Sequence, residues 1–300
     1  MSISGYLGMQ GKTVVITGAT TGIGTATAIA LARQGADVVM PARDRARGEA
    51  ARREILAARP GARVDLLSAD LASFASVRAL AAELIATYPR IDLLVNNAGV
   101  SRPTRALTVD GYEMTFAVNY LAPFLLTNLL VDRLEASAPA RVVNVASAAH
   151  AKRLDFDNLQ GERRYSLMGA YSTSKLALIL HTYELARRLE GAGVTANAVH
   201  PGGVRTEIYR DLTGVSRVGI KLVLPFLRTP EKGASTSVYV ATAPELSGVS
   251  GRYFADSREK ASSPASYDLD TARRLWELTE KMVGDLTPMP PSLKVRERDE

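Results

Sequence analysis

A tyrosine and a lysine four positions apart, Tyr171 and Lys175, stand in the stretch "GAYSTSKLAL", which leads into an apolar pattern of helical period. Residues at i and i+4 project from one face of a helix, so the two side chains reach the same small volume. A phenol is a weak acid with an ordinary pKa of about 10, and a cation beside it favours the ionised form. The pair is therefore suited to moving a proton to or from a carbonyl or alcohol oxygen.

Proton transfer to a carbonyl also needs a group that holds and polarises the oxygen. Ser147 ends the apolar run "ARVVNVAS", residues 140–147, which has the composition of a buried strand. In open α/β sheets, ligands bind at the carboxyl ends of the strands. Ser147 is therefore the candidate hydrogen-bond donor to the substrate oxygen.

A glycine-rich turn, "TGATTGIG" at Thr17–Gly24, lies between a predicted strand at 12–17 and a predicted helix at 22–35. Its glycines, Gly18, Gly22 and Gly24, allow a tight turn, a close approach to a pyrophosphate, and contact between helix and strand. The helix N-terminus offers free N–H groups and the positive end of the helix dipole. A glycine pattern alone is a weak signal, but this one stands in the strand-to-helix context that a nucleotide site requires.

The end of the second predicted strand bears on the choice of nucleotide. "VVMPARD" places Ala42 and Arg43 where an acid would bind the 2′-hydroxyl of a ribose. An arginine pairs with a 2′-phosphate through its planar fork, so this position predicts NADP(H) rather than NAD(H). The alternative is a surface arginine in an arginine-rich stretch.

Short β-branched or apolar runs alternate with longer segments of helical period from residue 12 onward, which is typical of βαβ units and a parallel sheet. This pattern predicts an α/β fold with a single doubly wound domain of the Rossmann type and helices on both faces of its sheet. Seven strands are expected at 12–17, 36–40, 63–68, 91–97, 140–147, 194–200 and 251–254. Helices are expected at 22–35, 46–60, 76–89 and 268–284.

Three residues separate Gly18 from Gly22, and this spacing, together with Ser147, Tyr171 and Lys175, resembles the short-chain dehydrogenase/reductase family over roughly residues 10 to 255. The resemblance implies a sheet of order 3-2-1-4-5-6-7 and an oxidoreductase in which the nicotinamide carries the hydride. It implies that Tyr171 is the general acid/base, Lys175 binds the nicotinamide ribose and tunes Tyr171, and Ser147 orients the substrate. Asn119, in "FAVNYLAPF", would hold a water in a proton relay.

The same resemblance supplies the expected cofactor site, which extends from the glycine turn through "SADLAS" and "NNAGV" to "PGGVRT" after the sixth strand. Within it, Asn97 is either a cofactor neighbour or a residue that supports the sheet. The expected cofactor-binding residues are Gly18, Thr20, Thr21, Gly22, Ile23, Gly24, Arg43, Asp70, Leu71, Asn97, Ala98, Gly99, Tyr171, Lys175, Pro201, Gly202, Val204 and Thr206.

Tyr171 follows Ser147 by 24 positions, about twice the spacing of compact family members, and the inserted "HAKRLDFDNLQGERRYSLMG" resembles the retinol dehydrogenase-like branch. That branch implies a bulky, apolar aldehyde, ketone or alcohol as substrate, with reduction favoured. A substrate lid is expected around 206–230. The apolar residues of this segment have two alternative interpretations, as core packing or as a patch against a membrane surface.

Composition excludes several other classes of function. The chain has no cysteine, and its 37 Lys and Arg are scattered among 31 acids, so a net charge of +6 does not indicate nucleic acid. The three histidines are too dispersed for a metal site, and none is expected. His150 either touches the substrate or is a hydrogen-bonded structural residue, and Met114 and Phe116 are expected in the core.

The ends of the chain and its surroundings give further expectations. The first residues lack a cationic start followed by an apolar run, and no apolar stretch looks long enough to span a bilayer, so a soluble cytoplasmic protein is expected. Residues 1–283 are expected to form the catalytic domain and 284–300 a mobile tail. The family resemblance suggests a homodimer or homotetramer. Dehydration or epimerisation at the same site, and a non-catalytic NADP-binding sensor or scaffold, are the alternative functions.

Overall fold

The computed structural model describes residues 8–204, 228–284 and 286. Thr206, nearly all of the expected lid and nearly all of the expected tail lie outside the described residues.

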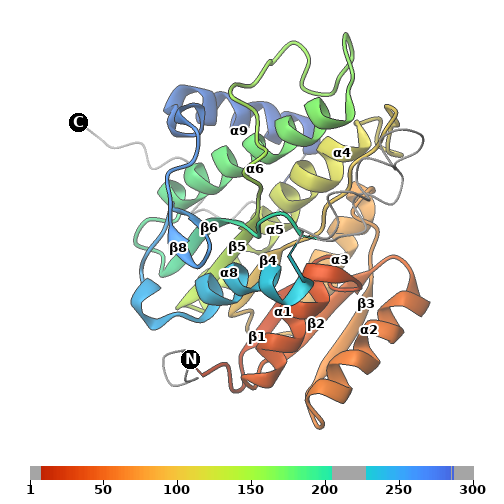
Figure 1. Ribbon diagram of the computed structural model, residues 1–300, viewed down its shortest axis with the longest axis vertical. Helices are drawn as coiled ribbons and strands as arrows, with labels where there is room; N and C mark the ends of the chain where they lie inside the picture. Colours follow the sequence, from red (N-terminus) through yellow and green to blue (C-terminus); the bar gives the residue numbers. More distant parts are fainter. Residues whose placement is uncertain (1–7, 205–227, 285, 287–300) are drawn as a thin grey trace.

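A single eight-stranded sheet in the order β3-β2-β1-β4-β5-β6-β7-β8 forms the centre of the molecule (Figure 1). All neighbouring strands are parallel except β7 and β8, which form an antiparallel pair. The predicted order is confirmed, and the short β8 is an addition that the sequence pattern did not indicate. The strands are β1 Thr13–Ile16, β2 Asp37–Ala42, β3 Val64–Ser68, β4 Leu93–Asn96, β5 Ala140–Val145, β6 Val194–His200, β7 Tyr253–Ala255 and β8 Arg258–Glu259.

Helices cover both faces of the sheet, as the βαβ pattern predicted. Strand β1 shows why: Val14 and Ile16 are buried in the hydrophobic cluster on one face, and Val15 is buried in the cluster on the other. One face carries α1 Gly22–Arg33, α2 Arg45–Ala58 and α8 Pro230–Thr242. The other carries α3 Phe74–Thr87, α5 Ala122–Ala136, α6 Leu167–Arg188 and α9 Leu269–Val283.

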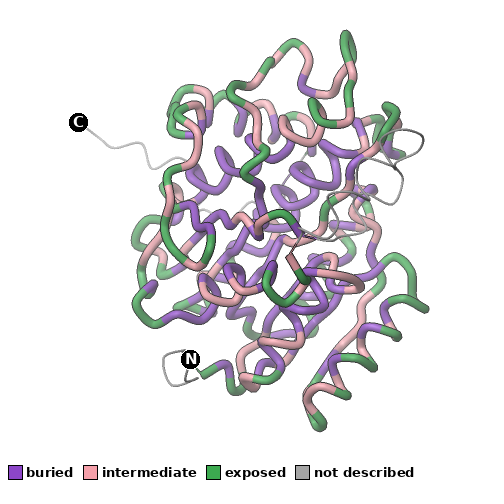
Figure 2. Tube along the Cα trace, in the orientation of Figure 1, coloured by how far each residue is buried: buried purple, intermediate pink, exposed green. Residues whose placement is uncertain are grey.

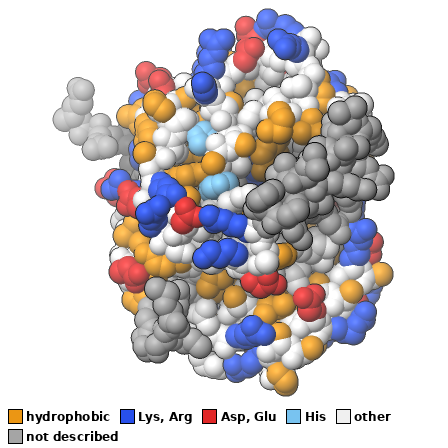
Figure 3. Space-filling model, viewed as in Figure 1, with side chains coloured by type: hydrophobic (Ala, Val, Ile, Leu, Met, Phe, Trp, Pro, Cys, Tyr) orange, Lys and Arg blue, Asp and Glu red, His pale blue; other side chains and the backbone are white. Residues whose placement is uncertain are grey.

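Burial follows this layered arrangement. The strands and the inward sides of the helices are buried, whereas the outer helix α2 alternates between buried and exposed positions along its length (Figure 2). On the face viewed in Figure 1, histidine, lysine and arginine side chains lie beside hydrophobic ones (Figure 3). The visible surface is therefore chemically mixed rather than a continuous basic patch.

Helix α9, the last helix among the described residues, packs on α6 and closes the cluster on that face of the sheet. Its fully buried Trp276 lies edge-on to Phe124 of α5, with ring centroids 4.8 Å apart, and stacks on His181 of α6 at 5.4 Å. Tyr120 and Thr279 share a hydrogen bond of 2.6 Å between their hydroxyls. Helix α9 thus joins residues near the end of the chain to its middle.

One helical stretch, Met114–Ala136, is long and apolar enough to cross a membrane, with a mean hydropathy of 1.5. The expectation that no stretch has this length and composition is therefore wrong. The stretch joins α4 Met114–Phe116, a π-helical turn η1 Ala117–Leu121 and α5, and its most apolar window is 89% buried inside the protein. Its apolar character serves the protein core, because both the sheet and α9 pack against it.

Candidate active site

A cleft of about 570 Å³ opens at the carboxyl ends of the parallel strands, where the fold class predicts a ligand site. It gathers residues from the glycine turn, the ends of β2 to β6 and the first turns of α6. Nearly every predicted site residue lies on its wall. These are Gly18, Thr20, Thr21, Gly22, Ile23, Gly24, Arg43, Asp70, Leu71, Asn97, Ala98, Gly99, Ser147, Tyr171, Lys175, Pro201, Gly202 and Val204.

The glycine turn has backbone conformations and contacts that require glycine. Gly18 and Gly22 have φ values of +64° and +58°, in the left-handed region that side chains with a Cβ rarely adopt. A Cβ on Gly24 would lie 2.1 Å from the carbonyl oxygen of Gly18. The three glycines therefore allow α1 to begin directly against the strand, with its first turn facing the cleft.

Helix α1 begins without the side-chain cap that other helices of this protein have. Asp44, Ser73, Ser166 and Asp268 each accept a backbone N–H at the start of α2, α3, α6 and α9, whereas Thr21 makes no such bond at the start of α1. Uncapped N–H groups at a helix start favour an anion such as a phosphate. Since this helix start lines the cleft, the residues present fit the pyrophosphate of a dinucleotide.

Asn97 holds the glycine turn in place. Its side-chain nitrogen donates to the backbone oxygens of Thr17 and Gly18, each at 3.0 Å. The hydroxyl of Thr17 accepts from the backbone N–H groups of Asn97 and Ala98, each at 3.1 Å. These contacts agree with the interpretation of Asn97 as a residue that supports the sheet, although it also lines the cleft.

Lys175 is buried, with 3% of its surface exposed, and its Nζ donates to the carbonyl oxygen of Val145 at 2.8 Å. The same nitrogen lies 5.6 Å from the centre of the Tyr171 ring. Burial lowers the pKa of Lys175 to about 8, because the charged ammonium loses its hydration. The helix spacing therefore does bring amine and phenol together, and the strand end orients the amine.

Ser147 lies two residues after the end of β5, with 6% of its surface exposed. Its hydroxyl oxygen accepts the backbone N–H of Ala149 at 3.1 Å. The hydroxyl hydrogen has no acceptor among the residues that the structure describes, so the group can donate toward the cleft. This is the arrangement that a donor to a substrate oxygen needs.

Asn119 is the predicted catalytic residue that does not reach the cleft. It is fully buried in the π-helical turn η1, where its Oδ1 accepts from the backbone N–H of Val100 at 2.8 Å. Its Nδ2 donates to the oxygen of Val100 at 3.0 Å and to the hydroxyl of Ser174 at 3.1 Å. The side chain therefore ties η1 to the loop after β4 and to α6, and its role in a water relay stays a prediction.

Two arginines line the end of the cleft that follows β2. The side chain of Arg43 is 64% exposed, and its Nη1 lies 3.8 Å from a carboxylate oxygen of Asp70. Arg47, on the first turn of α2, also lines the cleft. Asp44, the residue before α2, caps this helix by accepting the N–H of Arg47 at 3.1 Å.

Comparison with known proteins agrees with this geometry. A family model described as short chain dehydrogenase matches residues 12–214, which include the glycine turn and all four predicted catalytic residues. The chain belongs to the short-chain dehydrogenase family. Membership makes it an oxidoreductase and implies a nicotinamide dinucleotide cofactor, NAD(H) or NADP(H), with a small-molecule substrate.

This short-chain dehydrogenase is similar to retinol dehydrogenase 13 of Homo sapiens, with 46% identity over 92% of this chain and 86% of that protein. It is 48% identical to retinol dehydrogenase 14 of Mus musculus, over 93% of this chain and 87% of that one. The predicted likeness to the retinol dehydrogenase branch is therefore confirmed.

Two solved structures also resemble this short-chain dehydrogenase. A crystal structure of a Mycobacterium Paratuberculosis protein is 35% identical and superposes with a TM-score of 0.75, covering 93% of this chain and 95% of that chain. The Pseudomonas aeruginosa RhlG/NADP active-site complex is 26% identical, with a TM-score of 0.68, and covers 88% of this chain and 100% of that one.

The segment inserted between Ser147 and Tyr171 mainly braces the short-chain dehydrogenase core. The side-chain oxygen of Gln160 accepts the backbone N–H of Glu113 at 3.0 Å, and the hydroxyl of Tyr165 donates to the oxygen of Arg102 at 2.8 Å. Leu159 is buried in the cluster beneath α5 and α6. The insertion therefore supports the loop before η1, and only its last residues reach the cleft.

Several cleft residues of the short-chain dehydrogenase were not expected from the sequence. Met114 lines the cleft instead of lying in the core, whereas Phe116 is fully buried as predicted. Leu167 and Met168, at the start of α6, also line it, and Met168 is 56% exposed. The helical period around 167–188 could have indicated them, because residues three and four positions before Tyr171 lie on the same face of this helix as Tyr171.

Proposed function

We propose that this protein transfers a hydride between NADP(H) and the carbonyl or alcohol carbon of a bulky, apolar substrate, with carbonyl reduction favoured. The observation that carries the proposal is the convergence of Ser147, Tyr171 and Lys175 on one cleft wall, next to the uncapped start of α1. The likeness to retinol dehydrogenases supports an apolar aldehyde or alcohol. The cytoplasmic location and the homodimer or homotetramer stay predictions.

In reduction, the hydroxyl of Ser147 holds the substrate oxygen, and the phenol of Tyr171 gives it a proton as the carbon is reduced. The ammonium of Lys175, beside the Tyr171 ring, stabilises the phenolate that remains. The nicotinamide cofactor supplies the hydride when it is bound. In alcohol oxidation the same residues act in reverse, and the Tyr171 phenolate accepts the proton.

The choice of NADP(H) rests on the arginines after β2. Arg43 and Arg47 both line the cleft, and the nearby acid Asp44 is engaged as the cap of α2. Guanidinium groups pair with a 2′-phosphate, whereas binding a free 2′-hydroxyl would call for an acceptor there. The RhlG/NADP complex supports the same choice, because that structural relative holds NADP in this fold.

The apolar substrate agrees with the side chains beyond the catalytic residues. Met114, Val118, Leu167 and Met168 line the cleft together and offer an apolar wall. Burying apolar substrate surface contributes about 25 cal/mol per Å². A long apolar aldehyde should therefore have a much lower KM than a short one that carries the same reacting group.

The test follows the absorbance of NADPH with all-trans-retinaldehyde, an apolar ketone and butanal, and repeats the series with NADH. We expect consumption of NADPH with the bulky substrates, a higher KM for butanal, and little turnover with NADH. Equal use of NADPH and NADH would reject the cofactor assignment. Conversion of substrate without net change in NADPH would instead indicate dehydration or epimerisation.

Arg43→Ala sharpens the cofactor assignment. Loss of one charge-assisted pair with the 2′-phosphate should raise the KM for NADPH about tenfold, since such a contact contributes roughly 1.5 kcal/mol. The KM for NADH should stay within about twofold of its wild-type value. Arg53→Ala serves as the matched control, because Arg53 is an exposed arginine of α2 outside the cleft wall. Equal changes for NADPH and NADH would contradict the assignment.

A further inference from the structure

The imidazole of His150 is fully engaged in hydrogen bonds behind the catalytic serine. Its Nδ1 lies 2.7 Å from the carbonyl oxygen of Ser147, and its Nε2 accepts the backbone N–H of Ser263 at 3.1 Å. Because Nε2 accepts, a neutral ring carries its proton on Nδ1 and donates it to Ser147. His150 therefore joins the loop after β5 to the segment after β8. It does not line the cleft.

We infer that His150 is a positioning residue for Ser147, an inference that rests on the proposed function. The two residues after Ser147, Ala148 and Ala149, are exposed. Beyond them the backbone N–H of Ala151 donates to the oxygen of Ser172 on α6 at 2.9 Å. The other side-chain tether of the loop that carries Ser147 is His200 at the end of β6, whose Nδ1 accepts the N–H of Ala148 at 3.1 Å. The serine is thus held from two sides by imidazoles.

The segment at Ser263 is itself fixed to the catalytic helix. Ser262 shares a hydrogen bond of 2.7 Å with the hydroxyl of Tyr183, which lies on α6 three helical turns after Tyr171. Ser262 also bonds to Ser266 at 2.6 Å through their hydroxyls. A continuous chain of bonds therefore runs from α6 through Ser262, Ser263 and His150 to Ser147.

The long insertion makes this chain of bonds relevant to the geometry of the active site. Ser147 and Tyr171 are separated by 24 positions, so the serine and the phenol are not held in register by a short connection. Two groups that act on one oxygen must keep their relative positions, and a displacement of about 1 Å can reduce turnover about 100-fold. Beside the bond from Ala151 to Ser172, His150 adds a second link between the helix that carries Tyr171 and the loop that carries Ser147.

The ring of His150 also packs against a neighbouring side chain, so the test must distinguish the effect of this packing from the effect of the two hydrogen bonds. It lies edge-on to Tyr253 of β7, with centroids 6.1 Å apart. His150→Phe keeps an aromatic ring there and removes both bonds. His150→Asn places an amide nitrogen near the position of Nδ1, whereas His150→Gln places its amide near the position of Nε2.

The kinetic test compares these three variants in the full-length protein with NADPH and the best carbonyl substrate. We expect all three variants to lower kcat about tenfold, because each breaks the link between Ser263 and Ser147: His150→Phe loses both bonds, His150→Asn the bond to Ser263, and His150→Gln the bond to Ser147. The KM for NADPH should change by less than about twofold in all three, because His150 does not touch the cofactor site. Wild-type kcat in any of the three variants would overturn the inference.

A second measurement needs no turnover and separates this inference from the proposed function. The nitrogen NMR spectrum of the imidazoles, taken without cofactor at about pH 8, where an ordinary imidazole is neutral, distinguishes the two tautomers. We expect His150 protonated on Nδ1 and His200 protonated on Nε2, because its Nδ1 accepts the N–H of Ala148. A His150 proton on Nε2 overturns the inference even if the enzyme is active. If the protein shows the expected tautomer but reduces no carbonyl, the proposed function is wrong, and the hydrogen bond from His150 to Ser147 still stands.

Discussion

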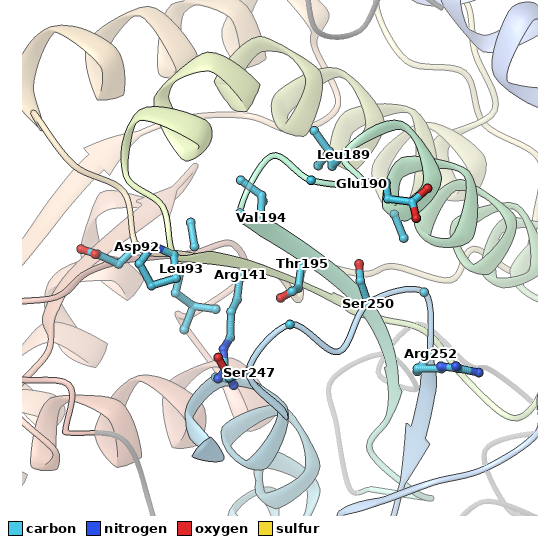
Figure 4. Close-up of a pocket in the computed structure, with 18 of the residues that line it drawn as sticks. Asp92, Leu93, Arg141, Leu189, Glu190, Val194, Thr195, Ser247, Ser250 and Arg252 are labelled. Carbon is cyan, nitrogen blue, oxygen red and sulfur yellow. The ribbon is translucent and has the colours of Figure 1, made fainter. Parts of the chain in front are cut away.

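The carboxyl and amino ends of the central sheet are both hollowed, and the larger cavity, about 1090 Å³ against about 570 Å³, lies at the amino end. Figure 4 shows the amino-end cavity, with Asp92, Arg141, Thr195 and Arg252 among its labelled lining residues. Its lining includes acids, bases and hydroxyls, as the catalytic cleft does. Size and composition alone would therefore favour the wrong end of the sheet.

The two ends differ in what their charged groups are bonded to. At the amino end, Asp92 accepts from Lys12 and Arg90, and Arg141 donates to the oxygens of Val240 and Ala243 at the end of α8. At the carboxyl end, Lys175 has three N–H donors and bonds one of them to Val145. A polar group that is held by one bond and has others to offer can act on a ligand, whereas Asp92 and Arg141 at the amino end are bonded within the fold.

The largest expected effect belongs to the carboxyl end. Tyr171→Phe removes the proton donor and should lower kcat about 1000-fold, within the range of general acid catalysis. The affinity for NADPH, measured by its fluorescence, should stay within about threefold, because the aromatic ring remains. Turnover near the wild-type value with NADPH still bound would show that the mechanism is wrong.

Asp92→Asn at the amino end should have the opposite effect, a loss of stability with unchanged kcat. Burial raises the pKa of Asp92, but hydrogen bonds from Lys12, Arg90 and the N–H of Thr13 outweigh burial and hold it below its ordinary value. A depressed carboxyl pKa gives stability that is present above the unfolded pKa, about 4, and is lost as the pH falls through the folded pKa. The variant should lose about 2 kcal/mol of unfolding free energy at pH 7.

Urea denaturation at pH 7 and below pH 4 measures this effect, and the difference between the variant and wild type should shrink at the acid pH. The kcat of the folded variant should equal that of wild type. A large loss of kcat without loss of stability would remove the distinction between the two ends.

The dependence of kcat/KM on pH tests the role of Lys175 in the cleft, and its expected change is of intermediate size. Burial lowers the pKa of Lys175 to about 8, so its ammonium loses its charge above that pH. Because kcat/KM reports the free enzyme, kcat/KM for NADPH should fall about tenfold per pH unit above about pH 8. Lys175→Met should be much slower and should lack this fall. A profile that is flat to about pH 10 would contradict the assigned role of the Lys175 charge.

The smallest effect is expected at the rim of the amino-end cavity. Arg252 lies 3.5 Å from a carboxylate oxygen of Glu259, and both side chains are more than half exposed. Solvent-exposed pairs contribute about 0.5 kcal/mol or less. Arg252→Met should change neither kcat nor the urea midpoint measurably. A clear loss of turnover would show that the amino-end cavity takes part in catalysis.

The sequence pattern predicted the parallel sheet, and the family resemblance supplied the strand order and most of the site residues, nearly all of which lie on the cleft wall. Alternating strands and helices indicate a parallel sheet, and the glycine turn and the i, i+4 pair carry their geometry in their spacing. Position 206 lies outside the described residues, so the expected role of Thr206 stays a prediction.

What the sequence did not predict depends on contacts between distant segments. The bonds of Asn119 to Val100 and of His150 to Ser263 join segments with no shared pattern. The stretch from Met114 to Ala136 has the length and composition of a membrane span, and its packing identifies it as a core helix. The choice between a substrate contact and a structural bond for His150 likewise required its neighbours.

Helix α9 has a consequence for the order in which the protein can be completed during synthesis. Arg78 donates to the oxygen of Val283 at 2.8 Å and Tyr112 to that of Met282 at 2.6 Å, so the first half of the chain is bonded to its last helix. A ribosome that has made the whole catalytic helix has not yet made Trp276, which packs against it. Nascent chains therefore hold Tyr171 and Lys175 on an incompletely packed helix, and the packing of this helix is completed only after α9 has emerged.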